Sequence, residues 1–69
     1  MAVCVIQVNG RRREIAAGAT VSVLLAELRL GGRKIAVEKN GAIVPKSRRD
    51  SETLAAGDAV EIVGAVGGG

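Results

Sequence analysis

The sequence contains no aromatic residue and no histidine, and it has one cysteine and one proline. With Cys4 as the only thiol, no disulfide can form within the chain. Without histidine, the side chains typical of a zinc site are also missing. The absence of aromatics argues against a nucleic-acid partner, because proteins that bind single strands usually stack bases on aromatic side chains.

The net charge is +3, and part of the basic charge lies in two short groups, Arg11–Arg13 and Arg48–Arg49. Glu14 and Asp50 directly follow these groups. We therefore expect the two basic groups to lie in solvated turns and at strand edges. Docking onto an acidic partner is the alternative.

No segment predicts a membrane span. The longest stretch without charge, residues 15–26, has 12 residues, whereas a span needs about 20 apolar ones. The N-terminal residues lack the positive region of a signal peptide. Together with the unpaired thiol, these features predict a cytoplasmic protein with no membrane partner.

The length of 69 residues predicts one domain, with a core made of aliphatic side chains alone. Residues 3–8 are rich in β-branched side chains and run into Asn9-Gly10, a strong hairpin signal. Residues 11–17 then form the return strand. Alternation places one set of side chains on a common apolar face: Cys4, Ile6, Val8 and Ile15.

A helix follows, with Thr20 as its N-cap. We expect Gly31-Gly32 to end it by supplying the left-handed residue that a helix C-terminus favours. Its apolar stripe has helical spacing: Val21, Leu24, Leu25 and Leu28.

The second half of the chain predicts further strands at 35–39, 42–44 and 59–63, with Asn40-Gly41 as a second tight turn. Pro45 suits a strand end, and residues 46–51 predict a polar loop. The expected fold class is α+β, a mixed four- to five-stranded sheet with one main helix on one face. The ubiquitin-like β-grasp has this order of elements, and there the last strand lies centrally beside the first. Residues 1–63 would form this domain.

Residues 64–69 predict a flexible tail that ends in Gly67-Gly68-Gly69. Three glycines lose much conformational entropy when ordered, so they do not serve to stabilise a fold. They give instead a narrow, flexible segment that ends in a carboxylate. At full extension residues 64–69 span about 20 Å, which is long enough to enter a deep pocket. A frayed terminus is the alternative interpretation.

Three segments together resemble the ThiS family of sulfur carriers: residues 6–10, residues 35–45 and residues 57–69. The resemblance runs from end to end, with two departures. One is Lys39, at a position where an apolar or small residue is expected, and the other is the basic net charge. It implies that a ThiF-type enzyme uses ATP and Mg²⁺ to adenylate the Gly69 carboxylate. Sulfur from a cysteine desulfurase then yields a thiocarboxylate, which a bacterial thiazole synthase uses in thiamin biosynthesis. The chain would be a protein cosubstrate, not an enzyme; it would bind no cofactor or metal itself and be a monomer when free.

The tail residues receive different expected roles. Gly69 carries the reacting carbon, and Gly68 lets the backbone pass a narrow channel where a Cβ would collide. Gly67 and Gly64 supply slack. Ala65 and Val66 pack at the mouth of the partner's channel or simply continue the strand.

Several alternatives stay open from the sequence. The chain could be the small subunit of molybdopterin synthase, which shares the fold and the terminal chemistry, or a ubiquitin-like modifier attached to lysines through Gly69. A β-grasp interaction module with an idle tail is a third class. Cys4 could carry a persulfide, although its place on an apolar strand face favours a buried hydrophobe.

Overall fold

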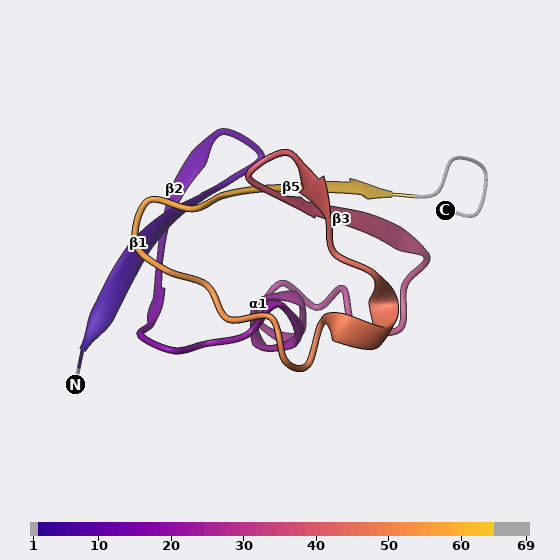
Figure 1. Ribbon diagram of the computed structural model, residues 1–69, viewed down its shortest axis with the longest axis horizontal. Coiled ribbons are helices and arrows are strands. Elements are labelled where there is room, and N and C mark those ends of the chain that lie inside the picture. The colour runs from indigo at the N-terminus through magenta and orange to yellow at the C-terminus, as the bar shows by residue number, and fades with distance from the viewer. Residues whose placement is uncertain (1, 65–69) are drawn as a thin grey trace.

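The structure, a computed structural model, describes residues 2–64. One mixed sheet of five strands has the order β2-β1-β5-β3-β4, and the only α-helix among the described residues lies on one face of it (Figure 1). This is the expected α+β architecture, and the last strand lies centrally beside the first. The elements are β1 (Val3–Val8), β2 (Arg11–Ala16), α1 (Val21–Glu27), β3 (Ile35–Lys39), β4 (Ala42–Ile43), the short 3₁₀ helix η1 (Lys46–Arg48) and β5 (Ala59–Gly64).

Both Asn-Gly pairs form the predicted hairpin turns. Asn9 and Gly10 have φ values of 51° and 81°, and Asn40 and Gly41 have 53° and 85°. Positive φ at both central residues defines the type I′ turn, whose twist matches that of the flanking strands. The first turn joins β1 to β2 and the second joins β3 to β4.

The N-terminus of α1 is capped as the sequence predicts. The Thr20 hydroxyl accepts a hydrogen bond from the Val23 N–H at 3.3 Å. The segment between β4 and β5 supplies two further acceptors, because the N–H groups of Val21 and Ser22 donate to the carbonyls of Glu52 and Arg49. This segment therefore satisfies donors that every helix leaves free at its start.

The predicted end of α1 is wrong. The left-handed residue that ends the helix is Arg29, with φ 60°; Gly32 also has a positive φ, 81°, but lies three residues further on. The Arg29 N–H donates to the Ala26 carbonyl at 3.0 Å, and the Leu30 N–H donates to the Leu25 carbonyl at 2.8 Å, which is the Schellman pattern. The helix ends this early because Leu30 then packs back against the core.

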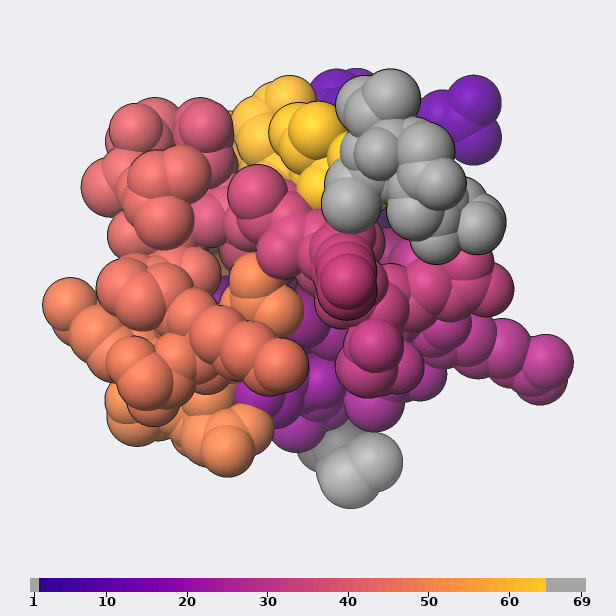
Figure 2. All heavy atoms as spheres, turned by 90° about the vertical axis from the view of Figure 1, so that its right-hand side faces the viewer, coloured from indigo at the N-terminus to yellow at the C-terminus, as the bar shows by residue number. Residues whose placement is uncertain are grey.

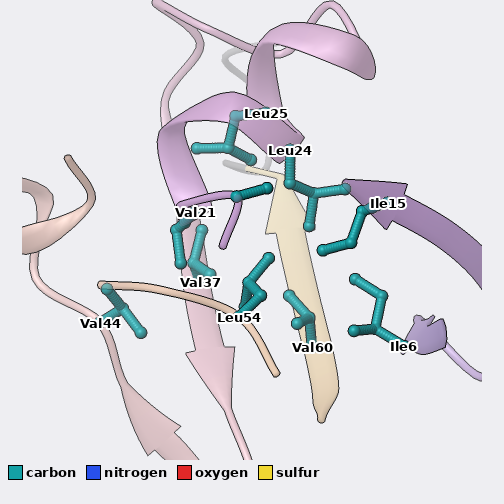
Figure 3. Close-up of a cluster of buried hydrophobic side chains, with 10 residues drawn as sticks. Ile6, Ile15, Val21, Leu24, Leu25, Val37, Val44, Leu54 and Val60 are labelled. Atoms are coloured by element: carbon teal, nitrogen blue, oxygen red, sulfur yellow. The ribbon is translucent and has the colours of Figure 1, made fainter. Parts of the chain in front are cut away.

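The core lies between α1 and the sheet and is entirely aliphatic (Figure 3). Ile6, Val37 and Val60 contribute from three neighbouring strands and are fully buried. The predicted helix stripe faces the sheet, and Cys4 and Val8 pack at the core margin on the predicted face of β1. The remaining buried members are Ile15, Ala19, Val21, Leu24, Leu25, Val44 and Leu54.

Residues 46–51 contain one turn of 3₁₀ helix, η1, where the sequence predicted only a loop. A single turn of this kind leaves little periodicity to detect, so the difference is expected. Within residues 2–64, no helix has the length and apolar character needed to cross a membrane.

Candidate functional site at the end of strand β5

Strand β5 joins the two halves of the sheet. On one side it pairs in parallel with β1, at Gln7–Ala59 and Val8–Val60. On the other side it pairs antiparallel with β3 over five of its six residues, from Lys39–Val60 to Ile35–Gly64. The strand that leads to the predicted tail is therefore held from both sides at its start and mainly from one side at its end.

Asn9 extends the β1 side of this pairing beyond the point where β1 turns away. Its backbone N–H donates to the Val60 carbonyl at 2.9 Å. Its side-chain oxygen accepts from the Ile62 N–H at 2.7 Å, and its side-chain nitrogen donates to the Ile62 carbonyl at 3.2 Å. The carboxamide thus makes the two bonds that a further strand residue would make.

Asn40 braces the start of β5 in a similar way. Its side-chain oxygen accepts from the Ala59 N–H at 2.9 Å, and its backbone N–H donates to the Ala59 carbonyl at 2.8 Å. Its side-chain nitrogen donates to Asp58 at 3.0 Å. The sequence identified both asparagines as turn residues but gave no sign of these long-range bonds, because nothing local specifies where the side chains reach.

Lys39, the residue that departs from the family pattern, is half-buried in an ion-pair cluster. Its Nζ lies 2.7 Å from Glu52 and 4.0 Å from Asp58, and it donates to the Thr53 carbonyl at 3.3 Å. The hydrogen bond with Glu52 raises the pKa of Lys39 against the effect of burial, and the same bond lowers the pKa of Glu52. A long cation here thus links β3 to the segment before β5.

Asp58 belongs to the same cluster. Burial acts to raise its pKa, but hydrogen bonds from the Ala55 N–H and from Asn40, with the charge of Lys39, lower the pKa overall. The carboxylate therefore fixes the turn that leads into β5.

Gly64 is the one predicted site residue that the structure describes. It is the last residue of β5, paired with Ile35, so the strand continues one residue further than the sequence predicted. A Cβ added at Gly64 would meet nothing within 4 Å, so the domain itself does not require glycine there. Ala65, Val66, Gly67, Gly68 and Gly69 lie outside the described residues, and their roles stay predictions.

A groove of about 600 Å³ lies beside the end of β5. Its apolar lining comes from strands β1, β3 and β5 and from the residues that follow α1. The lining residues are Val8, Asn9, Arg11, Arg12, Arg13, Leu28, Leu30, Ile35, Ile62 and Gly64. Figure 2 faces this end of the molecule, with the purple atoms of the β1–β2 hairpin and the yellow atoms of β5 near its upper edge.

The arginines of this groove differ in their partners. Arg12 pairs with Glu14 at 3.4 Å, and Arg13 pairs with Glu27 at 3.2 Å. Arg11 is exposed and has no side-chain ion pair among the described residues. The groove therefore combines an apolar lining with a basic edge.

No cluster of metal-ligating side chains is present in the part of the chain that the structure describes. Cys4 is half-buried on β1, opposite Ile15 of β2, and packs against the core. Its position fits the expected small hydrophobe.

Comparison with known proteins decides the family. The model of the ThiS family matches residues 6–69, which is nearly the whole chain. The chain belongs to the ThiS family. The crystal structure of a thiamine biosynthesis protein, ThiS, from Geobacter metallireducens superposes with a TM-score of 0.81 at 32% identity, over 94% of this chain and 99% of that one. The predicted ThiS-like β-grasp fold is thereby confirmed.

Two curated relatives of this ThiS-family chain are named thiazole synthase. The protein from Paramagnetospirillum magneticum is 47% identical over 62 residues, and the one from Magnetococcus marinus is 36% identical over 64 residues. These matches span 90% and 93% of this chain but only 19% and 20% of the relatives. The chain thus corresponds to about one fifth of each of these longer proteins.

Proposed function

We propose that the chain is a sulfur carrier of thiamin biosynthesis that works through the carboxylate of Gly69. The family match over residues 6–69 carries this proposal, because it includes the terminal glycines as well as the folded domain. The ThiS crystal structure supports it through the same fold over almost the entire chain. The chain would act as a cosubstrate inside the active sites of its partners.

A carboxylate needs activation before sulfur can be transferred to it, because its charge repels nucleophiles and it has no good leaving group. In the proposed sequence, a ThiF-type enzyme transfers AMP from ATP to the Gly69 carboxylate and releases pyrophosphate, with Mg²⁺ bound by that enzyme. A persulfide sulfur, supplied through a cysteine desulfurase, displaces AMP. Reduction of the remaining sulfur–sulfur bond by a thiol leaves the thiocarboxylate.

We further propose thiazole synthase as the acceptor of this sulfur. The two curated relatives named thiazole synthase contain a segment similar to this chain within one polypeptide, which supports a functional association. The match to ThiS favours the thiamin pathway over the molybdopterin pathway, for which no observation speaks specifically.

The experiment that tests the proposal combines the purified chain with ATP, Mg²⁺, the activating enzyme, the desulfurase, cysteine and a thiol reductant from one host. Intact mass spectrometry should detect exchange of one terminal oxygen for sulfur. A mass unchanged under all conditions would contradict the carrier function, and isopeptide adducts on lysines would support a modifier instead.

A matched pair of glycine variants localises the chemistry. Gly68→Ala places a Cβ in the predicted narrow passage and should strongly reduce thiocarboxylate formation. Gly31→Ala is the control, because a Cβ added at Gly31 would meet nothing within 4 Å and its φ is not positive. Equal yields from the two variants would argue against a threaded tail.

A further inference from the structure

We propose that the groove beside the end of β5 is the docking site for an extended, acidic segment of thiazole synthase, which pairs with the open backbone groups of Gly64 at the end of β5. This inference rests on the proposed function, since it concerns the partner that takes sulfur from Gly69. Three independent features of the described residues support it: the position of the groove, the free edge of β5, and the charge and apolarity of the lining.

The position of the groove follows from the length of the chain. Five residues separate Gly64 from the end of Gly69. Fully extended, they reach at most about 17 Å. An enzyme that acts on the carboxyl carbon of Gly69 must therefore approach the end of β5 closely, and the groove forms part of the surface around Gly64.

On the groove side, the backbone of β5 is open at Gly64, beyond the bonds that Asn9 makes to Val60 and Ile62. Successive residues of a strand direct their N–H and C=O groups to opposite sides, so residues two apart point to the same side. Because the Ile62 groups bond to Asn9 on the β1 side, the Gly64 groups also point to that side. No described strand lies there, since the pairing of β1 with β5 ends at Val8–Val60. An exposed edge of this kind accepts an added strand.

The lining selects the chemistry of that strand. Leu28, Leu30 and Ile62 are only half-buried and offer apolar contact. Arg11 lies at the edge of the groove without an ion pair to a described side chain, while Arg12 and Arg13 are paired within the domain. An extended segment with apolar side chains facing the floor and a carboxylate facing Arg11 fits both features.

Charge reversal tests the docking site. Arg11→Glu should weaken binding to purified thiazole synthase from the same host by on the order of tenfold at low salt. The binding should also lose most of its dependence on ionic strength. Arg11→Ala should show a smaller loss in the same direction. Titration calorimetry over a series of salt concentrations measures both effects, and circular dichroism checks that each variant is folded.

Lys46→Glu is the matched control, because it makes the same charge change at an exposed residue of η1. The orange segment that contains η1 lies at the lower left of Figure 2, away from the purple atoms of the β1–β2 hairpin at its upper edge. The control should bind like the parent chain. Equal losses in Arg11→Glu and Lys46→Glu would reduce the effect to net charge and overturn the proposal, as would an unchanged affinity in Arg11→Glu.

A second measurement tests strand addition directly. Hydrogen exchange at the Gly64 amide should slow markedly when thiazole synthase is added, and unaltered exchange in a saturated complex would contradict the added strand. Thiocarboxylate formation, measured separately by mass, distinguishes the two proposals. If the chain is thiocarboxylated but the groove variants bind normally, the carrier proposal stands and the docking proposal is wrong. If the chain is never thiocarboxylated, the carrier proposal itself is wrong.

Discussion

Replacing Asn9 by glycine isolates the two side-chain bonds that hold the end of β5. Glycine adopts the positive φ of the type I′ turn without strain, so Asn9→Gly keeps the hairpin and removes only the carboxamide. The bonds removed are those to the N–H and the C=O of Ile62, at 2.7 and 3.2 Å. Asn40→Gly makes the same change at the second turn and removes the side-chain bonds to Ala59 and Asp58.

The expected loss of unfolding free energy is about 1 kcal/mol for either variant. Each bond contributes roughly 0.5–1.5 kcal/mol net, and exposed bonds lie near the lower limit because water replaces them. The gain from relieving positive φ at asparagine is offset by the larger entropy of glycine in the unfolded chain. For a domain of this size, about 1 kcal/mol lowers Tm by roughly 4–8 °C.

Amide hydrogen exchange gives the decisive readout. The two variants should lose similar overall stability but should differ in which β5 amide exchanges faster. Asn9→Gly should speed exchange at Ile62 and leave Ala59 nearly unchanged relative to the global loss. Asn40→Gly should show the opposite pattern. If Ile62 stays equally protected in Asn9→Gly, the carboxamide does not replace a strand there, and the reasoning about the end of β5 fails.

Three further predictions concern other parts of the domain. Arg29→Gly should stabilise the fold by about 1 kcal/mol, because Arg29 has φ 60° at the helix end, and a lower Tm would contradict the assigned cap. Unfolding free energy should fall as the pH drops below about 4.5, the ordinary pKa of Glu52, because Lys39 lowers the pKa of Glu52 in the folded state. Denaturant titrations over a pH series should find a smaller fall in Lys39→Met. The raised pKa of Lys39 acts at the other end, so its stabilisation persists at neutral pH and is lost only as the pH rises above its ordinary value of 10.5. Cys4→Ser should lower stability slightly and leave sulfur transfer intact, and a folded variant that no longer forms thiocarboxylate would revive the persulfide interpretation.

Local signals were sufficient wherever one residue type satisfies a backbone requirement. Asn9-Gly10 and Asn40-Gly41 predicted both tight turns, and Thr20 predicted the helix start, because these positions need positive φ or a side-chain acceptor. The end of α1 was mispredicted for a tertiary reason. Glycines were present at 31 and 32, but the packing of Leu30 against the core places the left-handed residue at Arg29.

The candidate site was predictable only in part. The central place of β5 followed from the order of the elements and from the family resemblance, whereas the role of the terminal glycines stays a prediction. The bracing by Asn9 and the ion pair of Lys39 with Glu52 join residues far apart in the sequence, so no local pattern could predict them. The groove beside Gly64 likewise depends on how much of the sheet a short helix covers.

The strand order makes closure of the sheet depend on the last strand of the domain. The β1–β2 and β3–β4 hairpins share no strand pairing with each other, and among the described strands only β5 bonds to both. A chain that stopped before residue 59 would leave the two hairpins with no strand between them, although bonds between residues 19–22 and 49–54 would still link the two halves. Closure of the sheet therefore requires the chain to be complete through β5, the strand that ends at Gly64.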